Sequence, residues 1–152
     1  MIPLEAECVS REKLVGRPME ILLIEDDLED AGMTIEALRE SLVPCRVSLV
    51  RDGEEALAFL RRQDHFARTP RPDLILLDLR LPKKDGPAVL AEVRSDDELR
   101  RIPVVVLTAS ETHWQILKDE NLYVENYLVK PVDRLHFYEI VKSLRRHLLL
   151  PG

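Results

Sequence analysis

Leu74-Ile75-Leu76-Leu77-Asp78 places four aliphatic side chains in a row directly before a carboxylate. A run of this kind, without polar alternation, is typical of a strand that is buried on both faces of a parallel sheet. A charge at the end of such a strand requires a reason. In open α/β sheets, ligands bind at the carboxyl ends of the strands. Asp78 is therefore the first candidate functional residue.

A second run has the same design, because Ile21-Leu22-Leu23-Ile24 continues directly into Glu25-Asp26-Asp27. If the two strands are neighbours, Glu25, Asp26 and Asp78 lie within several ångströms of one another. Two unit charges about 4 Å apart repel by roughly 4 kcal/mol at an effective dielectric constant near 20. Such a cluster is either partly protonated or occupied by a cation. Oxygen ligands of this kind suit a hard divalent ion, and an open site suits Mg²⁺.

Apolar runs alternate with segments of helical periodicity along most of the chain. Strands are expected at residues 19–24, 45–50, 74–78, 104–108 and 125–129, and helices at 29–41, 53–63, 87–95, 111–121 and 133–149. Strict alternation predicts an α/β fold, a doubly wound five-stranded parallel sheet with helices on both faces. This domain spans residues 19–149. Residues 1–18 are expected to form an N-terminal arm and 150–152 a short tail.

One connection of the predicted fold is long. Residues 65–72 carry two prolines and two arginines between the second helix and the third strand. Connections of two to six residues are the norm in α/β units, so this segment is interpreted as a specialised surface loop.

Composition restricts the class of protein. The chain has 152 residues and a net charge of −6, and its basic pairs are scattered, which argues against a nucleic-acid partner. No apolar stretch approaches the length of a membrane span, and the N-terminus lacks the apolar core of a signal peptide. We therefore expect a cytoplasmic protein with no membrane association. Cys8 and Cys45 have no metal-binding spacing and predict no disulfide framework.

Two further polar residues follow predicted strands at the same edge of the sheet. Thr108 follows Val104-Val105-Val106-Leu107, and Lys130 follows Tyr127-Leu128-Val129. An ammonium and a hydroxyl that face a metal-loaded carboxylate are suited to hold phosphoryl oxygens. A carboxylate can itself be the nucleophile and form an aspartyl-phosphate. Asp78 is the candidate nucleophile, and Asp26 is better placed as a metal ligand.

Five segments of the chain together resemble the receiver domain of bacterial response regulators, which has a flavodoxin-like fold. These segments are Leu22–Asp27, Leu77–Pro82, Asp85-Gly86, Thr108-Ala109 and Tyr127–Pro131, in the order that the family shows. The resemblance covers roughly residues 19–149. It implies Asp78 as phosphoacceptor and a sensor histidine kinase as partner.

The resemblance also implies roles for the residues around Asp78. Asp26, Asp78 and the backbone carbonyl of Arg80 would bind Mg²⁺, and Glu25 would act through water. Thr108 and Lys130 would bind the phosphoryl group, and Tyr127 would be an aromatic switch. The Lys130-Pro131 bond would be cis and would aim the lysine. A tyrosine in a last strand is about as often a packing residue as a switch.

A narrower similarity links the chain to the single-domain regulators that are paired with bacterial phytochrome histidine kinases. It is carried by Arg71–Leu79, Leu81–Gly86, Ile102–Thr108 and Leu149–Pro151. The similarity implies a phytochrome as the kinase partner. Because the chain ends at Gly152, signalling is expected to proceed by protein contact or by onward phosphotransfer rather than through an output domain.

The last predicted helix carries apolar residues beyond its core-facing stripe. Leu135, Tyr138 and Leu149 fall on a second face, beside Lys142. Clustered exposed apolar residues mark interfaces. The resemblance implies pairing through the fourth helix, fifth strand and fifth helix, so we expect a homodimer.

Several alternatives were weighed against this interpretation. A phosphatase of the aspartyl-phosphate type requires a second Asp two residues after the first, where this chain has Arg80. A flavin-binding module requires a phosphate loop after the first strand, where the acids at 25–27 would repel phosphate. A degenerate receiver that serves as a scaffold, or a phosphotransfer intermediate, remains open. Arg80 is hypothesised to change the lifetime of the phosphoryl group.

Overall fold

The computed structural model describes residues 2–6, 17–81, 83–110, 115–119 and 122–148. Five parallel strands form the predicted sheet: β2 (Met19–Ile24), β3 (Cys45–Val50), β4 (Leu74–Asp78), β5 (Val104–Thr108) and β6 (Asn126–Val129). With an additional edge strand, β1 (Ile2–Ala6), the strand order is β1-β3-β2-β4-β5-β6. The doubly wound parallel sheet is therefore confirmed, and the two acid-terminated strands, β2 and β4, are direct neighbours.

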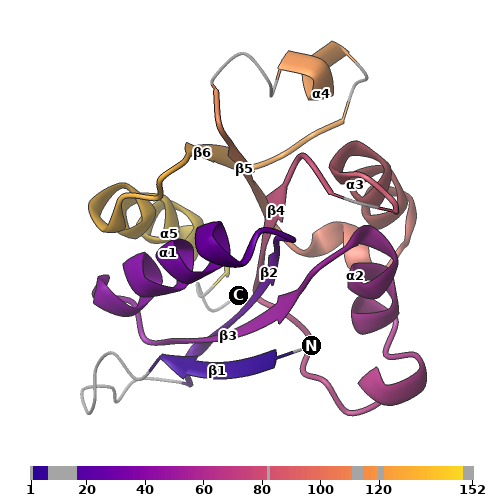
Figure 1. The fold of residues 1–152 in the computed structure, drawn as a ribbon, viewed down its shortest axis with the longest axis horizontal. Coiled ribbons are helices and arrows are strands. Elements are labelled where there is room, and N and C mark those ends of the chain that lie inside the picture. The colour runs from indigo at the N-terminus through magenta and orange to yellow at the C-terminus, as the bar shows by residue number, and fades with distance from the viewer. Residues whose placement is uncertain (1, 7–16, 82, 111–114, 120–121, 149–152) are drawn as a thin grey trace.

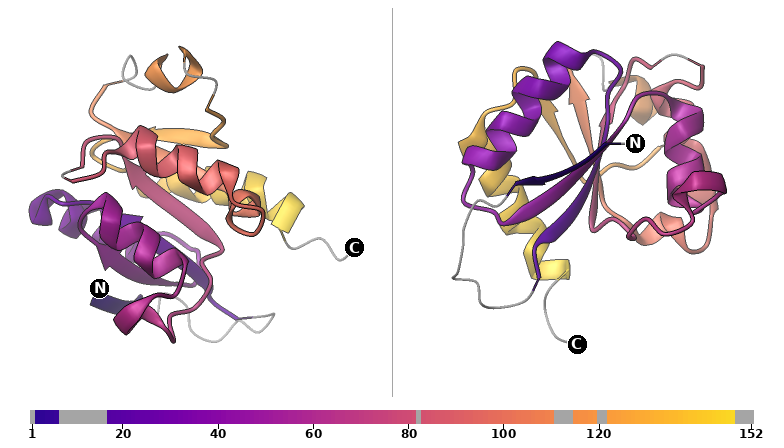
Figure 2. Two further views of the ribbon diagram at one scale, coloured as in Figure 1. Left: turned by 90° about the vertical axis from the view of Figure 1, so that its right-hand side faces the viewer. Right: turned by 60° about the horizontal axis from the view of Figure 1, so that its bottom comes forward.

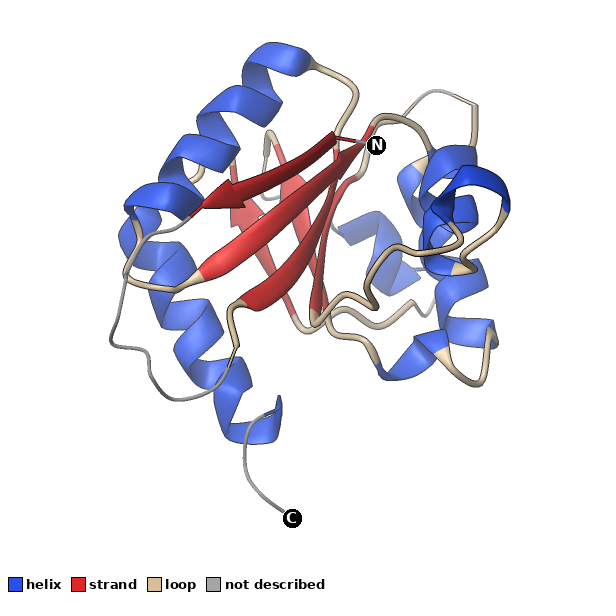
Figure 3. Ribbon diagram, turned by 90° about the horizontal axis from the view of Figure 1, so that it is seen from below, coloured by secondary structure: helices blue, strands red, loops and turns tan. Residues whose placement is uncertain are grey.

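Helices cover both faces of the sheet, as Figures 1 and 3 show. They are α1 (Leu28–Glu40), α2 (Gly53–Leu60), α3 (Gly86–Ser95), α4 (Gln115–Asp119) and α5 (Arg134–Leu148), with short 3-10 turns η1 (Asp64–Phe66) and η2 (Leu99–Arg101). Helices α1 and α5 lie on one face and α2 and α3 on the other, which the two views of Figure 2 make clear.

Aspartates cap the starts of four of these helices. Asp27, Asp52, Asp85 and Asp133 each precede a first turn and accept hydrogen bonds from its backbone N–H groups. Such caps satisfy N–H groups that have no partner within the helix. Pro87 lies in the first turn of α3, where its missing N–H leaves no hydrogen bond unmade.

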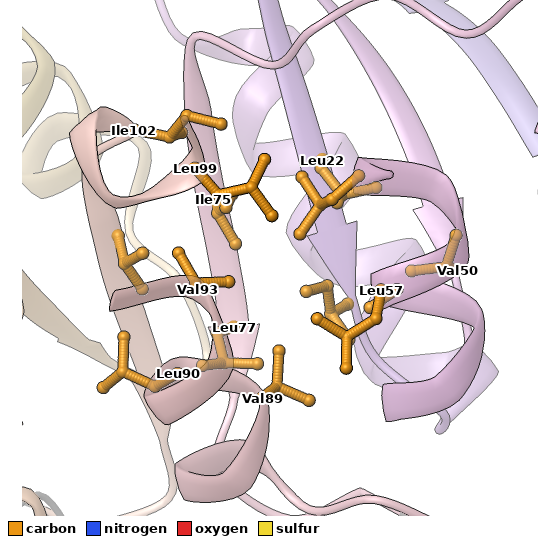
Figure 4. Close-up of a cluster of buried hydrophobic side chains, with 14 of the residues drawn as sticks. Leu22, Val50, Leu57, Ile75, Leu77, Val89, Leu90, Val93, Leu99 and Ile102 are labelled. Carbon is orange, nitrogen blue, oxygen red and sulfur yellow. The ribbon is translucent and has the colours of Figure 1, made fainter. Parts of the chain in front are cut away.

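The hydrophobic core has two halves, one on each face of the sheet. Successive side chains of a strand point to opposite faces. Leu23 accordingly packs on the α1–α5 side, while Leu22 and Ile24 pack on the α2–α3 side. Figure 4 shows the second half, in which Leu77 lies close to the apolar residues of α3. Burial of each such side chain contributes about 1.5–3 kcal/mol, and it fixes β4 as a central strand.

The predicted N-terminal arm differs from the structure at residues 2–6. These residues form a strand, β1 (Ile2–Ala6), which pairs antiparallel with β3, so the sheet has a sixth, antiparallel edge strand. Five residues with one proline are too short to show a strand period in the sequence. Residues 7–16 and the predicted tail at 150–152 lie outside the described residues.

Element boundaries otherwise agree closely with the expected ones. The second helix ends at Leu60 instead of residue 63, and the long loop that follows contains η1. Of the expected helix at 111–121, the structure describes residues 115–119 as α4, and the remainder lies outside the described residues.

Candidate functional site

The acids and the lysine meet in a cleft of about 490 Å³ at the carboxyl edge of the sheet. The loops after β2, β4, β5 and β6 form its walls. Its lining residues are Glu25, Asp26, Asp27, Asp30, Asp78, Leu79, Arg80, Leu81, Thr108, Ala109 and Lys130. Parallel strands end at the same edge, which is why residues more than a hundred positions apart share one cleft.

Three carboxylates lie at the floor of the cleft. Ligand oxygens of Glu25, Asp26 and Asp78 all lie within 4.8 Å of one another. Glu25 is fully buried and Asp78 is 6% exposed. Asp27 N donates a 3.2 Å hydrogen bond to Glu25 Oε2, whereas Glu25 Oε1 accepts no hydrogen bond of good geometry from the described residues. A buried oxygen in an all-oxygen cluster of this size fits a hard divalent cation.

Lys130 supplies the positive charge of the cleft. Its Nζ lies 2.7 Å from Glu25 Oε1, 2.9 Å from Asp78 Oδ2 and 3.0 Å from Asp30 Oδ2. The Lys130-Pro131 bond is cis, as expected. The third partner, Asp30 in the first turn of α1, was missed by the sequence analysis. Its position three residues after the last acid of the 25–27 run was the only signal.

The charges of the cleft shift the protonation of two groups. Burial and, second, the neighbouring Asp78 raise the pKa of Glu25 to about 8, against the opposing effect of Lys130. Burial lowers the pKa of Lys130, but its close contacts with the carboxylates of Glu25, Asp78 and Asp30 outweigh this, so that the pKa is raised overall. Lys130 is therefore charged at neutral pH, and in the metal-free cleft Glu25 holds a proton over a wide pH range.

Both oxygens of Asp78 are engaged. Oδ2 accepts from Lys130, and Oδ1 accepts a 3.0 Å hydrogen bond from the backbone N–H of Arg80. These two contacts orient the carboxylate into the cleft. The side chain of Arg80 is exposed and lines the cleft mouth.

Thr108 and Tyr127 lie on the last two strands. Thr108, the last residue of β5, is buried, and its hydroxyl donates a 2.8 Å hydrogen bond to the carbonyl of Ser110. Its hydroxyl is thus bound within its own loop. Tyr127, the second residue of β6, is half-buried and packs against the core on the α2–α3 side. It is in register with Val106 of the neighbouring strand β5.

The geometry agrees with the comparison to known proteins. The profile of the response regulator receiver domain matches residues 21–142. The chain belongs to the response regulator receiver family. Its members are signalling switches, and membership favours this interpretation over the phosphatase and flavin alternatives.

Three relatives are similar to this chain over most of its length, and two of them are described as phytochrome response regulators. Response regulator Rcp1 from Synechocystis sp. is 42% identical over 127 residues, which cover 84% of this chain and 86% of Rcp1. The structure of the phosphorylated cyanobacterial phytochrome response regulator RcpA is 46% identical, with a TM-score of 0.70 and coverage of 87% and 94%. The bacteriophytochrome response regulator RtBRR is 43% identical, with a TM-score of 0.78 and coverage of 84% and 78%.

A metal-bound relative bears on the acidic cluster. The Mn²⁺-bound form of Rcp1 is 40% identical, with a TM-score of 0.69 and coverage of 89% of this chain and 98% of Rcp1. The acids Glu25, Asp26 and Asp78 form a cluster that suits the same class of ion.

The chain is thus a receiver-domain response regulator of a two-component phosphorelay, and a histidine kinase is its class of partner. No helix among the described residues is long and apolar enough to cross a membrane.

Proposed function

We propose that Asp78 accepts a phosphoryl group from a sensor histidine kinase of the bacterial phytochrome class, with Mg²⁺ as the cofactor. The position of Asp78 carries the proposal. Its carboxylate lies within 4.8 Å of the oxygens of two further acids, and it contacts Lys130 at 2.9 Å in an open cleft.

Asp26, Asp78 and the backbone carbonyl of Arg80 would bind the metal directly, and Glu25 would act on it through water. The oxygen-only donor set and the buried Oε1 of Glu25 support this assignment. A bound Mg²⁺ supplies positive charge that neutralises the acids and polarises the phosphoryl oxygens. With two acids and a carbonyl as direct ligands, room remains for water and for the phosphoryl group.

In the transfer, an Asp78 carboxylate oxygen attacks the phosphorus of the kinase phosphohistidine. The new P–O bond forms as the P–N bond breaks, and the electron pair of the P–N bond returns to the imidazole nitrogen. Lys130 offsets the negative charge that the phosphoryl group brings. Thr108 exchanges its hydrogen bond to Ser110 for one to a phosphoryl oxygen, and Tyr127 changes rotamer as that loop moves.

The names of the relatives support a phytochrome as the kinase. RcpA is described as a cyanobacterial phytochrome response regulator and RtBRR as a bacteriophytochrome response regulator. At 46% and 43% identity, both are similar to this chain over most of its length. In this proposal the protein acts in the cytoplasm through protein contacts, without nucleic acid. It catalyses only its own phosphorylation and dephosphorylation.

The face formed by α4, β6 and α5 is the proposed homodimer surface. Leu135, at the start of α5, is 64% exposed, which supports the proposal. The sequence predicts that Tyr138 is exposed on this face, but its side chain packs partly against the core on the α1 side of the sheet. Lys142 Nζ lies 5.9 Å from the centroid of its ring. Leu149 lies outside the described residues.

Labelling by a small-molecule phosphodonor tests the proposal directly. We expect acetyl phosphate to label the wild-type protein when Mg²⁺ is present, and Asp78→Asn to abolish the label. Label that survives this substitution, or that forms equally well in excess chelator, would overturn the mechanism. Phosphotransfer from purified histidine kinases of the source organism then tests the partner, and faster transfer from a non-phytochrome kinase would reject the phytochrome assignment.

A further inference from the structure

Two glycines of the chain are in close contact with the loop that follows Asp78. We call residues 79–85 the acceptor loop, of which residue 82 lies outside the described residues. Gly53 begins α2 and Gly86 begins α3, and each helix start touches one part of this loop. Neither glycine lies in the left-handed region of backbone conformation, so both are required for space and not for flexibility.

Gly53 is the tighter of the two contacts. A Cβ at this position would overlap the backbone carbonyl oxygen of Lys84 and would lie 2.8 Å from its carbonyl carbon. The obstacle is backbone, which cannot rotate away as a side chain can. Any side chain at residue 53 must therefore push the acceptor loop away from α2.

Ion pairs also connect the acceptor loop to α2 and α3. Lys84 Nζ pairs with Glu92 of α3, and Glu92 is also bound by Arg61 from the end of α2 at 2.9 Å. Lys83 Nζ lies 3.6 Å from Asp52, the residue that caps α2. The loop is thus fastened to α2 and α3 by charge as well as by close backbone contact.

The other end of the loop is fixed beside Asp78. Leu79 N donates to Leu107 O at 3.3 Å, and Arg80 N donates to Asp78 Oδ1 at 3.0 Å. A Cβ on Gly86 would lie 2.7 Å from Leu79 Cα and 2.8 Å from the carbonyl oxygen of Asp78. A loop held at both ends keeps the intervening backbone of Arg80 in one place.

We propose that Gly53 is a positioning residue of the phosphoacceptor site, because the close approach of Lys84 that it permits holds the acceptor loop and the backbone of Arg80 against Asp78. The role rests on the proposed function of Asp78 and of the Arg80 carbonyl. Gly53 lies outside the cleft and touches none of the reacting atoms.

The test is Gly53→Ala, with Gly32→Ala as the matched control, because a Cβ at Gly32 in α1 meets no atom within 4 Å. In the metal-free protein, we expect faster hydrogen exchange at the Arg80 amide in Gly53→Ala only. Calorimetric titration with Mn²⁺ should show binding about 10- to 100-fold weaker, the range for residues that support metal ligands. The control should match the wild type in both measurements.

A second variant keeps the inference testable if Gly53→Ala does not fold. Lys84→Met removes the ion pair with Glu92 and leaves the stem of the side chain, and it should weaken Mn²⁺ binding with little change in Tm. Arg39→Met, which removes an exposed pair with Glu36, is its control. The positioning role would be overturned if Gly53→Ala binds Mn²⁺ with wild-type affinity and shows wild-type exchange at the Arg80 amide. If only Lys84→Met folds, the same two results in that variant would overturn it. Labelling of Asp78 in the wild type does not depend on either result. If the positioning role is rejected, the assignment of Asp78 as phosphoacceptor therefore still stands.

Discussion

At the scale of single residues, the cleft contains more negative charge than its one lysine balances. Lys130 contacts Glu25, Asp78 and Asp30 at once, and Asp26 adds a further carboxylate. The buried Glu25 responds by holding a proton, which is the cheapest way to reduce repulsion in a low-dielectric site. A divalent cation bound to this cluster would relieve the same repulsion.

The first prediction concerns Glu25 and pH. Its pKa is raised from 4.5 to about 8, so the folded protein binds this proton more tightly than the unfolded chain does. The stabilisation is complete below pH 4.5 and is lost as pH rises toward about 8. Unfolding in urea without metal should show this decline.

Metal binding should show the opposite trend, because the metal competes with the proton of Glu25. Mn²⁺ affinity should increase as pH rises toward about 8, with proton release visible as a buffer-dependent binding enthalpy. Glu25→Gln carries no proton to lose and should remove most of this pH dependence. Proton release that is equal in wild type and Glu25→Gln would contradict the prediction.

The second prediction concerns Arg80, whose side chain lies at the mouth of the cleft. Its guanidinium is expected to shield the aspartyl-phosphate, while its carbonyl is unaffected by a side-chain change. Arg80→Ala should shorten the phosphoryl lifetime by up to about fivefold, since an exposed charge pair contributes about 0.2–1 kcal/mol. Decay of labelled protein measures this. Arg39→Ala is the control, because Arg39 pairs with Glu36 within α1, away from the cleft and the acceptor loop, and equal decay in Arg80→Ala and wild type would reject the shielding role.

At the scale of elements, the site depends on two buried strands that end side by side. Ile24 of β2 is in register with Leu77 of β4, so the acids that follow both strands meet. Core residues on both faces hold the strands in place, whereas the last strand residues and the loops that follow form the candidate site. The polar side chains of the site therefore lie at the edge of the apolar core.

The third prediction concerns β1, which covers the edge of β3. Pro3 has no N–H and so suits an edge strand, where it also limits further strand pairing. Removal of residues 1–6 should lower the opening free energy of β3 amides by about 1 kcal/mol, the net value of one backbone hydrogen bond. Native-state hydrogen exchange measures this. Amides of β6, at the opposite edge, serve as the internal control, and unchanged exchange in β3 would exclude the edge-covering role.

At the scale of the whole molecule, the two sides of the sheet serve different purposes. The cleft opens at the carboxyl edge, and α4, β6 and α5 form the proposed pairing face at the side of the sheet away from β1. In the proposed function, a signal from Asp78 to that face would pass through Thr108 at the end of β5 and Tyr127 on β6, which are neighbouring strands.

The fourth prediction concerns assembly. Light scattering should give a mass above the 17.5 kDa monomer at high concentration. Leu135→Asp should weaken pairing about tenfold or more, since burial of a leucine contributes about 1.5–3 kcal/mol. Leu42→Asp, at another exposed leucine, which follows α1, is the control. A strict monomer with and without phosphorylation would rule out the dimer.

Much of the fold was predictable because its signals are local. The runs that form β2 and β4 are long, apolar and closed by acids, and their ranges were predicted to the residue. The strand β1 was missed, because five residues that pair only with a distant edge carry no period of their own. Tyr138 was assigned to an exposed face, although contact with the core beside α1 decides its burial.

The sequence by itself determined the five parallel strands and the cluster of Glu25, Asp26, Asp78, Thr108 and Lys130 at one edge, because buried runs and strand-end polar residues are written locally in the chain. Only the tertiary structure decided that Lys130 bridges three carboxylates, Asp30 among them, and that Gly53 meets the backbone of Lys84. These contacts join residues that are far apart in the chain. Their distances depend on how helices pack on the sheet, and no local pattern of residues records that packing.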